Sequence, residues 1–486
     1  MRGLLKILVA AAALPVTVAG CTNMHGLFTT AKIGDANTLE ATRTLAAHAP
    51  GSGAPWPAAD WWKQFGDAQL DALVDEGLAH SPNLKIAQAR IAKAGALAKL
   101  ARAALAPDIN ADLDVSRQRF SENYIYPPPY GGSWYTQSQL ELNLNYDLDF
   151  WGKNRAAYDS ELGKLKAAEV DAFAARLLLS ASIAHAYIQL QHAYDQLDIA
   201  QALLKQREDL LDLTRQRVDV GIDSQVDLKQ AEAMIPASKQ QIAQIEESIA
   251  LARNQLAALI GRGPDRGLAI ARPHAQRPAS AALPSNVPAE LIGRRPDVVA
   301  QRWRVEAATR DIDVAKAQFY PNVNLAAFIG FQSLGLSDLV QYASRTMGIG
   351  PAITLPIYAG GQLRANLAGK NADYDIAVEQ YNQTLVDALH DVVDQLASLR
   401  SADTQRTELD RGIATARQAY ELAQSRYQAG IDNYLQVLAA QGQLLAQKNL
   451  DADLHARELD LSIDLIRALG GGFDNTAVAA AMAPGS

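Results

Sequence analysis

Apolar and polar residues alternate with a period of two in four stretches of the chain, and two of these stretches begin just after a proline, Pro107 or Pro321. Strict alternation over about ten residues predicts a strand with one apolar and one polar face. The polar positions of the first pair of stretches are mostly Asp and Asn. The four predicted strands cover about 108–116, 138–150, 322–332 and 346–357.

Strands of this length and pattern fit the wall of a transmembrane β-barrel. A soluble antiparallel sheet with one wet face alternates in the same way and is the plainer alternative. Four strands cannot close a barrel, and an open edge in lipid leaves backbone groups unpaired, so the chain must oligomerise. Two copies give eight strands with a filled interior, whereas three give twelve strands and a lumen. The residues expected to face the lumen are Asp112, Asp114, Asn143, Asn145, Asp147 and Asp149.

Each predicted strand pair runs into a very long helix, over about 151–220 and 362–429. Leu385, Leu389, Val392, Leu396 and Leu399 are spaced 4, 3, 4, 3, which is the seam of a coiled coil or of a helix bundle. The long helices end at Gly221 and Gly430, and return helices are expected over about 224–260 and 433–469.

The chain repeats itself. The helix-and-proline segment around Pro107 returns 214 positions later, and Arg217 to Asp223 returns as Arg426 to Asp432, 209 positions later. Repetition in this order predicts a duplicated helix–strand–strand–helix–helix unit. The expected fold is therefore mainly α with a transmembrane β-barrel, four strands per chain, in which a trimeric 12-stranded barrel continues into a long α-helical coiled-coil barrel.

The N-terminus has a short basic region, an apolar stretch of about 13 residues and small residues before Cys21, the single cysteine. This is typical of a secretory signal peptide over 1–20. Cys21 is expected to carry lipid, and an ordinary signal peptide with an incidental cysteine is the alternative. The remaining divisions are a tether (21–55), the first repeat (56–260), a connecting equatorial segment (261–293), the second repeat (294–470) and a disordered tail (471–486).

Charge and the placement of chemically reactive residues exclude several classes of function. The formal net charge is −8, which argues against a nucleic-acid-binding protein. His185 and His192 share a helix face but lie about 10 Å apart along it, too far to hold one metal ion. We find no catalytic constellation and no phosphate-binding loop, and we expect neither an enzyme nor a cofactor.

Several motifs in fixed order resemble the TolC-like outer-membrane efflux channels, in particular their lipoprotein (OprM- or NodT-like) branch. They are the lipobox at Cys21, the run from Trp61 to Asp67, the run from Arg294 to Val298, and the two Gly-Ile-Asp turns. The resemblance covers about residues 18 to 470. It implies a homotrimer in the outer membrane that works with a periplasmic membrane-fusion adaptor and an inner-membrane pump of the RND type.

The resemblance also implies that the hairpin turns meet the adaptor at the periplasmic entrance. The turn residues are Gly221, Ile222, Asp223, Ser224, Gly430, Ile431, Asp432 and Asn433. Simple capping of the next helix is the alternative role for Asp223 and Asp432. Ala439 and Gly442 stand where some relatives carry an Asp–Arg gate, so an apolar constriction at Leu435 is expected instead. The expected function is an exit duct for drugs or other small toxic molecules. The alternatives are a duct for polypeptide secretion and a structural coiled-coil lipoprotein without a pore.

Overall fold

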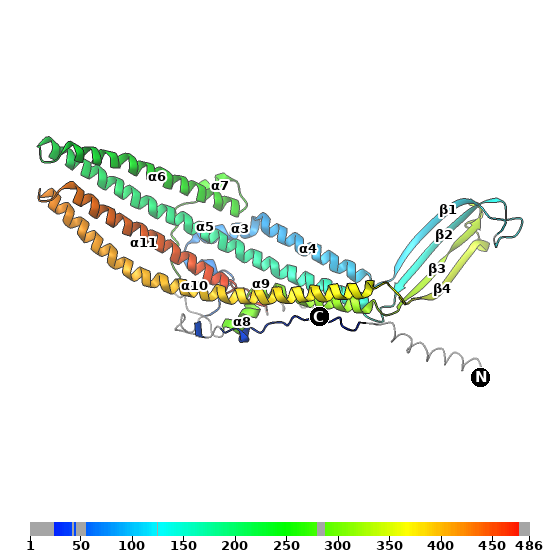
Figure 1. Ribbon diagram of the computed structural model, residues 1–486. Coiled ribbons are helices and arrows are strands. Elements are labelled where there is room, and N and C mark those ends of the chain that lie inside the picture. Colours follow the sequence, from blue (N-terminus) through cyan, green and yellow to red (C-terminus); the bar gives the residue numbers. More distant parts are fainter. Residues whose placement is uncertain (1–23, 41–42, 45–54, 124, 279–286, 476–486) are drawn as a thin grey trace. The chain divides into compact units, whose positions relative to one another are not determined.

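A computed structural model describes residues 24–40, 43–44, 55–123, 125–278 and 287–475 (Figure 1). The predicted signal peptide and Cys21 lie outside the described residues. The chain divides into two compact units. The strand unit comprises residues up to 33 together with 90–168 and 301–381, and the hairpin unit comprises 34–89, 169–300 and the chain from 382 onward.

The element order repeats, as the sequence predicts. The first copy runs α3 (Ala68–His80), α4 (Pro82–Ala103), β1 (Asp108–Arg119), β2 (Trp134–Asp147), α5 (Lys153–Asp219) and α6 (Gln225–Leu259). The second runs α8 (Val287–Arg294), α9 (Pro296–Ala317), β3 (Asn322–Leu334), β4 (Arg345–Thr354), α10 (Gln362–Gln428) and α11 (Tyr434–Ala468). Short elements are η1 (Ala36–Thr38), η2 (Trp61–Phe65), α7 (Pro264–Leu268) and η3 (Tyr342–Ser344).

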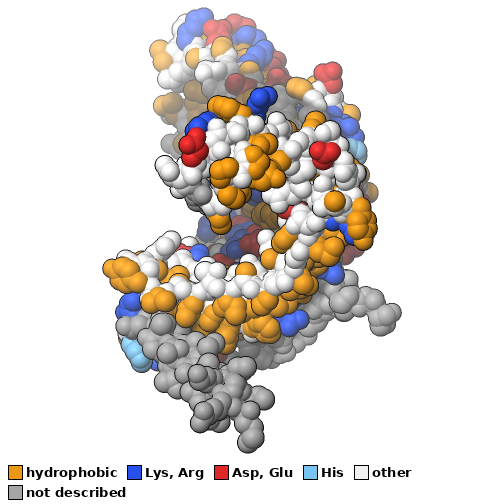
Figure 2. Space-filling view, turned by 90° about the vertical axis from the view of Figure 1, so that its right-hand side faces the viewer, with side chains coloured by type: hydrophobic (Ala, Val, Ile, Leu, Met, Phe, Trp, Pro, Cys, Tyr) orange, Lys and Arg blue, Asp and Glu red, His pale blue; other side chains and the backbone are white. Residues whose placement is uncertain are grey.

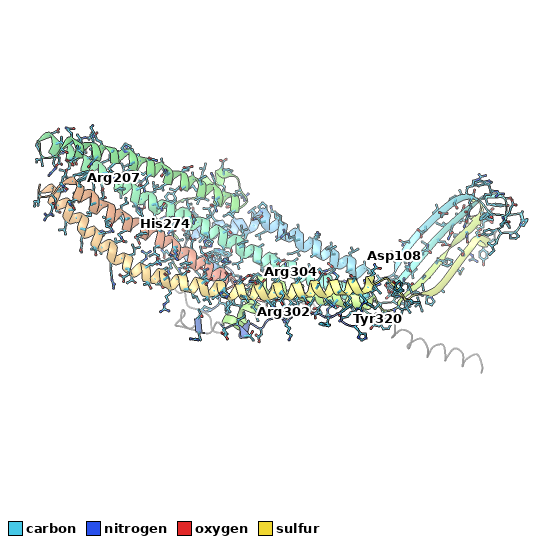
Figure 3. All side chains as sticks on the ribbon, in the orientation of Figure 1. Asp108, Arg207, His274, Arg302, Arg304 and Tyr320 are labelled. Atoms are coloured by element: carbon cyan, nitrogen blue, oxygen red, sulfur yellow. The ribbon has the colours of Figure 1, made fainter. Side chains whose placement is uncertain are left out.

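The strand unit holds one antiparallel sheet in the order β1-β2-β3-β4. Its register places apolar residues opposite one another across all four strands, in rows such as Ile109, Leu144, Ala327 and Ile349. Viewed from the strand end, hydrophobic side chains gather along one side of the curved sheet, and mainly uncharged white surface covers the other (Figure 2). Asp108 and Tyr320 lie where the strands meet the helices (Figure 3).

Several strand boundaries differ from the prediction, and β1 ends at Arg119 rather than 116. β2 begins at Trp134 rather than 138 and ends at Asp147 rather than 150, and β4 ends at Thr354 rather than 357. Beyond β2, the carboxylate of Asp149 accepts hydrogen bonds from the backbone N–H groups of Asn154 (3.0 Å) and Arg155 (2.8 Å). Asp149 therefore satisfies the first turn of α5 and lies beyond the end of β2, so the prediction that it belongs to the strand is wrong.

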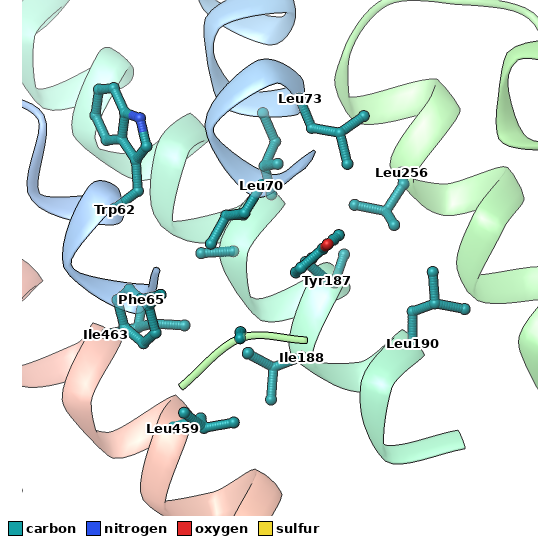
Figure 4. Close-up of a cluster of buried hydrophobic side chains, with 14 of the residues drawn as sticks. Trp62, Phe65, Leu70, Leu73, Tyr187, Ile188, Leu190, Leu256, Leu459 and Ile463 are labelled. Atoms are coloured by element: carbon teal, nitrogen blue, oxygen red, sulfur yellow. The ribbon is translucent and has the colours of Figure 1, made fainter. Parts of the chain in front are cut away.

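The hairpin unit is built around a core that gathers the Trp61-to-Asp67 motif (Figure 4). Trp61 and Phe65 are fully buried among apolar residues of α3, α5, α6 and α11. Asp67 begins α3 by accepting from Gln69 N, and its other oxygen accepts from the hydroxyl of Tyr187 at 2.7 Å. The motif thus serves to fasten this unit together.

The Arg294-to-Val298 motif also has a structural role in the hairpin unit. The guanidinium of Arg295 is buried and donates to Asp297 (3.0 and 2.6 Å) and to Asp391 (3.0 Å). It also reaches the carbonyl oxygen of Ala468 at the end of α11. Burial lowers the pKa of Arg295, but the two carboxylates outweigh it and raise the pKa above its usual value.

The described part of the tether is fixed to α10. In the strand unit the backbone N–H groups of Thr30 and Ala31 donate to Asp375, each at 3.0 Å to Oδ1. In the hairpin unit Gly34 N donates to Asn382 Oδ1 at 2.7 Å.

The first residues of the predicted disordered tail are ordered, so the prediction is wrong for them: Phe473 is buried and its ring lies 5.4 Å from that of Phe173. Residues 476–486 lie outside the described part.

Candidate functional site

The two hairpin turns share one backbone design. Gly221 and Gly430 have φ of 77° and 72°, in the left-handed region that L side chains disfavour. The residue after each glycine donates its N–H back to an arginine carbonyl: Ile222 to Arg217 at 2.8 Å, and Ile431 to Arg426 at 3.0 Å. This is the glycine-terminated helix end that the sequence predicts.

Helix caps follow the turns, but they are not the aspartates. Ser224 begins α6 in a capping box: its hydroxyl accepts from Asp227 N, and the carboxylate of Asp227 accepts from Ser224 N. Asn433 begins α11 by accepting from Gln436 N at 3.3 Å. Asp223 and Asp432 make no such bond, so the capping alternative for them is wrong.

Each aspartate instead binds an arginine six residues before it. Arg217 donates through Nε and Nη2 to the two oxygens of Asp223, at 2.9 and 3.1 Å. Arg426 Nε donates to Asp432 at 2.5 Å. The pairing closes each turn across its own glycine.

The second repeat covers the first of these ion pairs. The ring of Tyr427 lies 4.2 Å from the guanidinium of Arg217, and the Tyr427 carbonyl accepts from Arg217 Nη1 at 2.8 Å. The Tyr427 hydroxyl donates to Asp223 Oδ2 at 2.5 Å. The side chains of Arg217 and Asp223 are only 10% and 8% exposed, against 55% and 32% for Arg426 and Asp432.

These contacts perturb titration at the first tip. The hydrogen bond to Asp223 raises the pKa of Arg217. Burial, with the hydrogen bond to Asp223, raises the pKa of Tyr427 to about 12. Tyr427 therefore keeps its proton at neutral pH and remains a donor, and the buried ion pair is satisfied on both sides, as such a pair requires.

Apolar side chains project from the tips. Ile222 and Ile431, the residues that follow the glycines, are 62% and 65% exposed. Leu435 lies in the first turn of α11 and is 53% exposed, whereas its neighbours Tyr434 and Val437 are buried in the cluster that joins the two hairpins. Exposed apolar side chains grouped at a solvated helix end are typical of a contact surface.

The sheet brings together most of the residues predicted to line a lumen. Asp112, Asp114, Asn143 and Asn145 share its polar face, and Asn143 Nδ2 donates to Asp112 at 2.9 Å. Asp147 shares that face at the helix end, where it binds Lys153 at 2.9 Å. This face offers acidic and amide groups on β1 and β2, with Phe328 of β3 opposite Asn143.

Arg217, Arg426 and Tyr427 are not among the site residues predicted from the sequence. The arginine–aspartate spacing of six was visible in the repeated Arg-to-Asp run. Tyr427 stands where the first copy has Val218, at one of the three positions at which these two runs differ. Among the described residues, no group of three or more His, Cys, Asp or Glu could hold a metal ion. No described helix combines the length and apolar character needed to cross a membrane.

Comparison with known proteins assigns the duplication to one family. A family model described as outer membrane efflux protein matches residues 73–262 and again 287–471. The chain is 40% identical over 374 residues to the fusaric acid resistance protein FusA of Burkholderia cepacia, covering 76% of this chain and 70% of FusA. It is 34% identical over 430 residues to the multidrug resistance outer membrane protein MdtP of Escherichia coli K12, covering 86% and 87%.

Solved structures agree with the fold. The outer membrane protein VceC of Vibrio cholerae superimposes with a TM-score of 0.81 at 39% identity, covering 86% of this chain and all of that one. The outer-membrane channel OprN gives 0.82 at 28% identity, covering 92% and 97%.

Proposed function

The chain belongs to the outer membrane efflux protein family, and we propose that three copies of it form the passive exit duct of a tripartite drug-efflux pump. The open sheet carries this proposal. Among the described residues, β1 and β4 each pair with a single strand, so the sheet has two free edges. A sheet with one apolar face and two free edges is unstable in lipid until the edges find partners.

Three copies satisfy both closure and conduction. Twelve strands leave a lumen, and the polar face with Asp112 and Asn143 would line it. The apolar face, with Leu144 in its central row, would meet the lipid. Native mass measurement in detergent tests the stoichiometry: a trimer is expected, and a stable monomer or dimer contradicts it.

The tips form the periplasmic entrance and dock the adaptor. The exposed residues Ile222 and Ile431 supply the apolar contact, and Leu435 of three copies meets at the axis as the narrowest point. Energy for transport comes from the inner-membrane pump, which the adaptor joins to these tips. The cargo class is small toxic compounds, in keeping with relatives named for resistance to fusaric acid and to multiple drugs.

An efflux assay tests the tip assignment. In cells that lack the native channel, wild-type protein should restore drug resistance. Ile222→Asp and Ile431→Asp should abolish resistance and adaptor crosslinking while leaving the trimer intact, because they place a charge in an apolar contact. Leu251→Asp is a matched control, since Leu251 is equally exposed (60%) but lies far along α6 from the turn. Loss of resistance in the control alone would refute the assignment.

The anchor is a separate part of the proposal. Cys21 carries the lipid of the mature N-terminus, and the evidence is its place after a signal-peptide sequence. Cys21→Ser should abolish acyl labelling, while the barrel still inserts through its strands. Unchanged labelling of Cys21→Ser would contradict the anchor.

A further inference from the structure

The sheet of the strand unit sorts its charges by sign between its two faces. The polar face carries only acidic residues among its charged positions, namely Asp108, Asp112, Asp114, Glu141 and Asp147. The apolar face carries only arginines: Arg117 and Arg119 on β1 and Arg345 on β4. The strand register shows on which face Arg345 lies. Arg345 pairs with Phe331, Phe331 pairs with Leu140, and Leu140 pairs with Leu113, so all four residues share the apolar face.

All three arginines lie at the loop end of the sheet. Arg117 and Arg119 end β1 before the loop to β2, and Arg345 begins β4 after the loop from β3. Arg117 is two positions beyond Val115, about 7 Å further along the strand at 3.4 Å per residue. Arg117 and Arg119 therefore stand past the apolar positions of β1, and Arg345, the first residue of β4, stands before the apolar positions of its own strand. Counted along the strands, all three reach the level of the lipid headgroups.

Closure of the barrel brings these arginines together across the subunit seam. Within one chain, the row of paired residues that starts at Asp108 on β1 crosses the sheet to Gly350 on β4. Gly350 lies four residues before Thr354, the last residue of β4. Both Asp108 and Thr354 mark the helix end of their strands. If β1 pairs with β4 of the next subunit so that Asp108 lies opposite Thr354, Arg117 lies opposite the partner subunit's Arg345. If the pairing is shifted by two residues, Arg119 lies opposite the partner subunit's Arg345 instead. In either register the three guanidinium groups are neighbours on the lipid side.

The cluster has too few anions of its own. Arg119 pairs with Glu122 at 2.9 Å, and Arg345 stacks on Tyr342 at 3.4 Å and donates to the Tyr342 carbonyl at 3.2 Å. Among the described residues, Glu122 is the one carboxylate that pairs with these three arginines, so two guanidinium groups at each seam have no carboxylate partner. Like charges opposite one another on neighbouring strands are destabilising. An anion between them removes that cost.

We propose that each seam binds a phosphate group of an outer-leaflet glycolipid through Arg117, Arg119 and the partner subunit's Arg345. The inference rests on the proposed trimer. Guanidinium groups match phosphate oxygens with paired hydrogen bonds, and long arginine side chains reach from an apolar surface to the headgroup level. The adjoining apolar face holds the acyl chains of the same lipid, which selects a lipid-borne phosphate over a free one.

Disulfide crosslinking tests the seam. The chain has one native cysteine, Cys21, so introduced pairs report cleanly. Arg345→Cys combined with Arg117→Cys or with Arg119→Cys should link subunits of an assembled trimer, because paired strands hold Cα atoms within disulfide reach. Arg345→Cys with Ile109→Cys is the control and should not link. A native trimer that links through neither arginine pair overturns this inference alone, whereas absence of a trimer overturns the proposed function.

Lipid binding is then measured with unaltered protein. Native mass spectrometry of the wild-type trimer should retain lipid A that carries its phosphates and lose the same lipid after the phosphates are removed. Equal retention of the two lipids overturns the inference. Inorganic phosphate at the same concentration should not displace the lipid; complete displacement would mean that the lipid itself is not recognised.

Variants identify the residues. Arg117→Gln and Arg345→Gln should each weaken lipid A binding by about tenfold, the loss expected for one charge-assisted contact. Arg155→Gln is the matched control, an exposed arginine in the first turn of α5 at the other end of the strands. Unchanged binding in both seam variants, or an equal loss in the control, overturns the assignment. If the variants do not assemble, the comparison of the two lipids on wild-type trimer decides.

Discussion

The Tyr427 hydroxyl donates a 2.5 Å hydrogen bond to Asp223, so a helix of the second repeat closes the turn of the first. The relationship is not reciprocal. The equivalent pair in the second turn, Arg426 and Asp432, is half-exposed. The two tips share an arginine and a Gly-Ile-Asp turn, yet they are held with different strength, because only the first is fastened to its neighbour.

Removal of one carboxylate charge from each tip should show this difference. Asp223→Asn leaves the guanidinium of Arg217 buried without a charge partner and should cost about 3–5 kcal/mol of unfolding free energy. Asp432→Asn removes a partly exposed pair and should cost under about 1 kcal/mol. Thermal unfolding of the two purified variants checks the order. Equal losses would contradict the buried setting of Asp223.

A side chain at either turn glycine should lower the free energy of unfolding, because the backbone conformation there disfavours L residues. A Cβ at Gly430 meets no atom within 4 Å, but its φ of 72° is strained for other residues. Gly430→Ala should cost about 1–2 kcal/mol of unfolding free energy. Gly442→Ala is the control, since Gly442 lies inside α11 with open space around it, and should stabilise by up to about 1 kcal/mol. The same sign of change in both variants would refute the turn assignment.

Periodic patterns predicted most of this fold, since an alternating strand or a heptad helix is a local property. The strands, long hairpins and duplication followed from them. What the sequence could not supply were contacts between distant residues. The six-residue spacing of Arg217 and Asp223 was readable, yet nothing local indicated that Tyr427 would cover them. Asp149 looked like a continuation of the β2 alternation because it lies two residues after Asp147, where the next polar position of the strand would fall. It instead starts α5.

The two faces of β2 should respond oppositely to the same substitution. Leu144→Arg places a charge in the apolar row and should impair membrane insertion, at a cost of about 2–4 kcal/mol near the midplane. Asn143→Arg adds the charge beside Asp112 on the polar face, where it should leave assembly intact and alter ion selectivity. Protease protection and trimer yield compare the two. Equal tolerance at both positions would contradict the assigned faces.

The contact between α5 and α11 should be sensitive to alkaline pH. Burial lowers the pKa of His185, but the carboxylates of Asp460 and Asp464 outweigh it and raise the pKa from 6.5 to about 9. A raised histidine pKa gives stability that is complete below pH 6.5 and is lost as the pH rises through 9. The melting temperature should therefore fall between pH 7 and pH 10.

A histidine variant isolates that effect. His185→Gln should melt lower than wild type at pH 7 and flatten the pH dependence. His390→Gln, at an exposed position on α10, should keep the wild-type profile. A fall in melting temperature that persists unchanged in His185→Gln would assign it to other groups.

The central claim is a conduit that three copies build and that narrows at the tips, and single-channel recording in planar bilayers tests it most directly. Purified wild-type trimer should give discrete openings of one unitary conductance, and Leu435→Ser should raise that conductance by removing an apolar side chain from the narrowest point. Leu450→Ser, a similarly exposed leucine further along α11, should leave it unchanged. Intact trimers that insert without conducting, or a conductance indifferent to Leu435, would contradict the account.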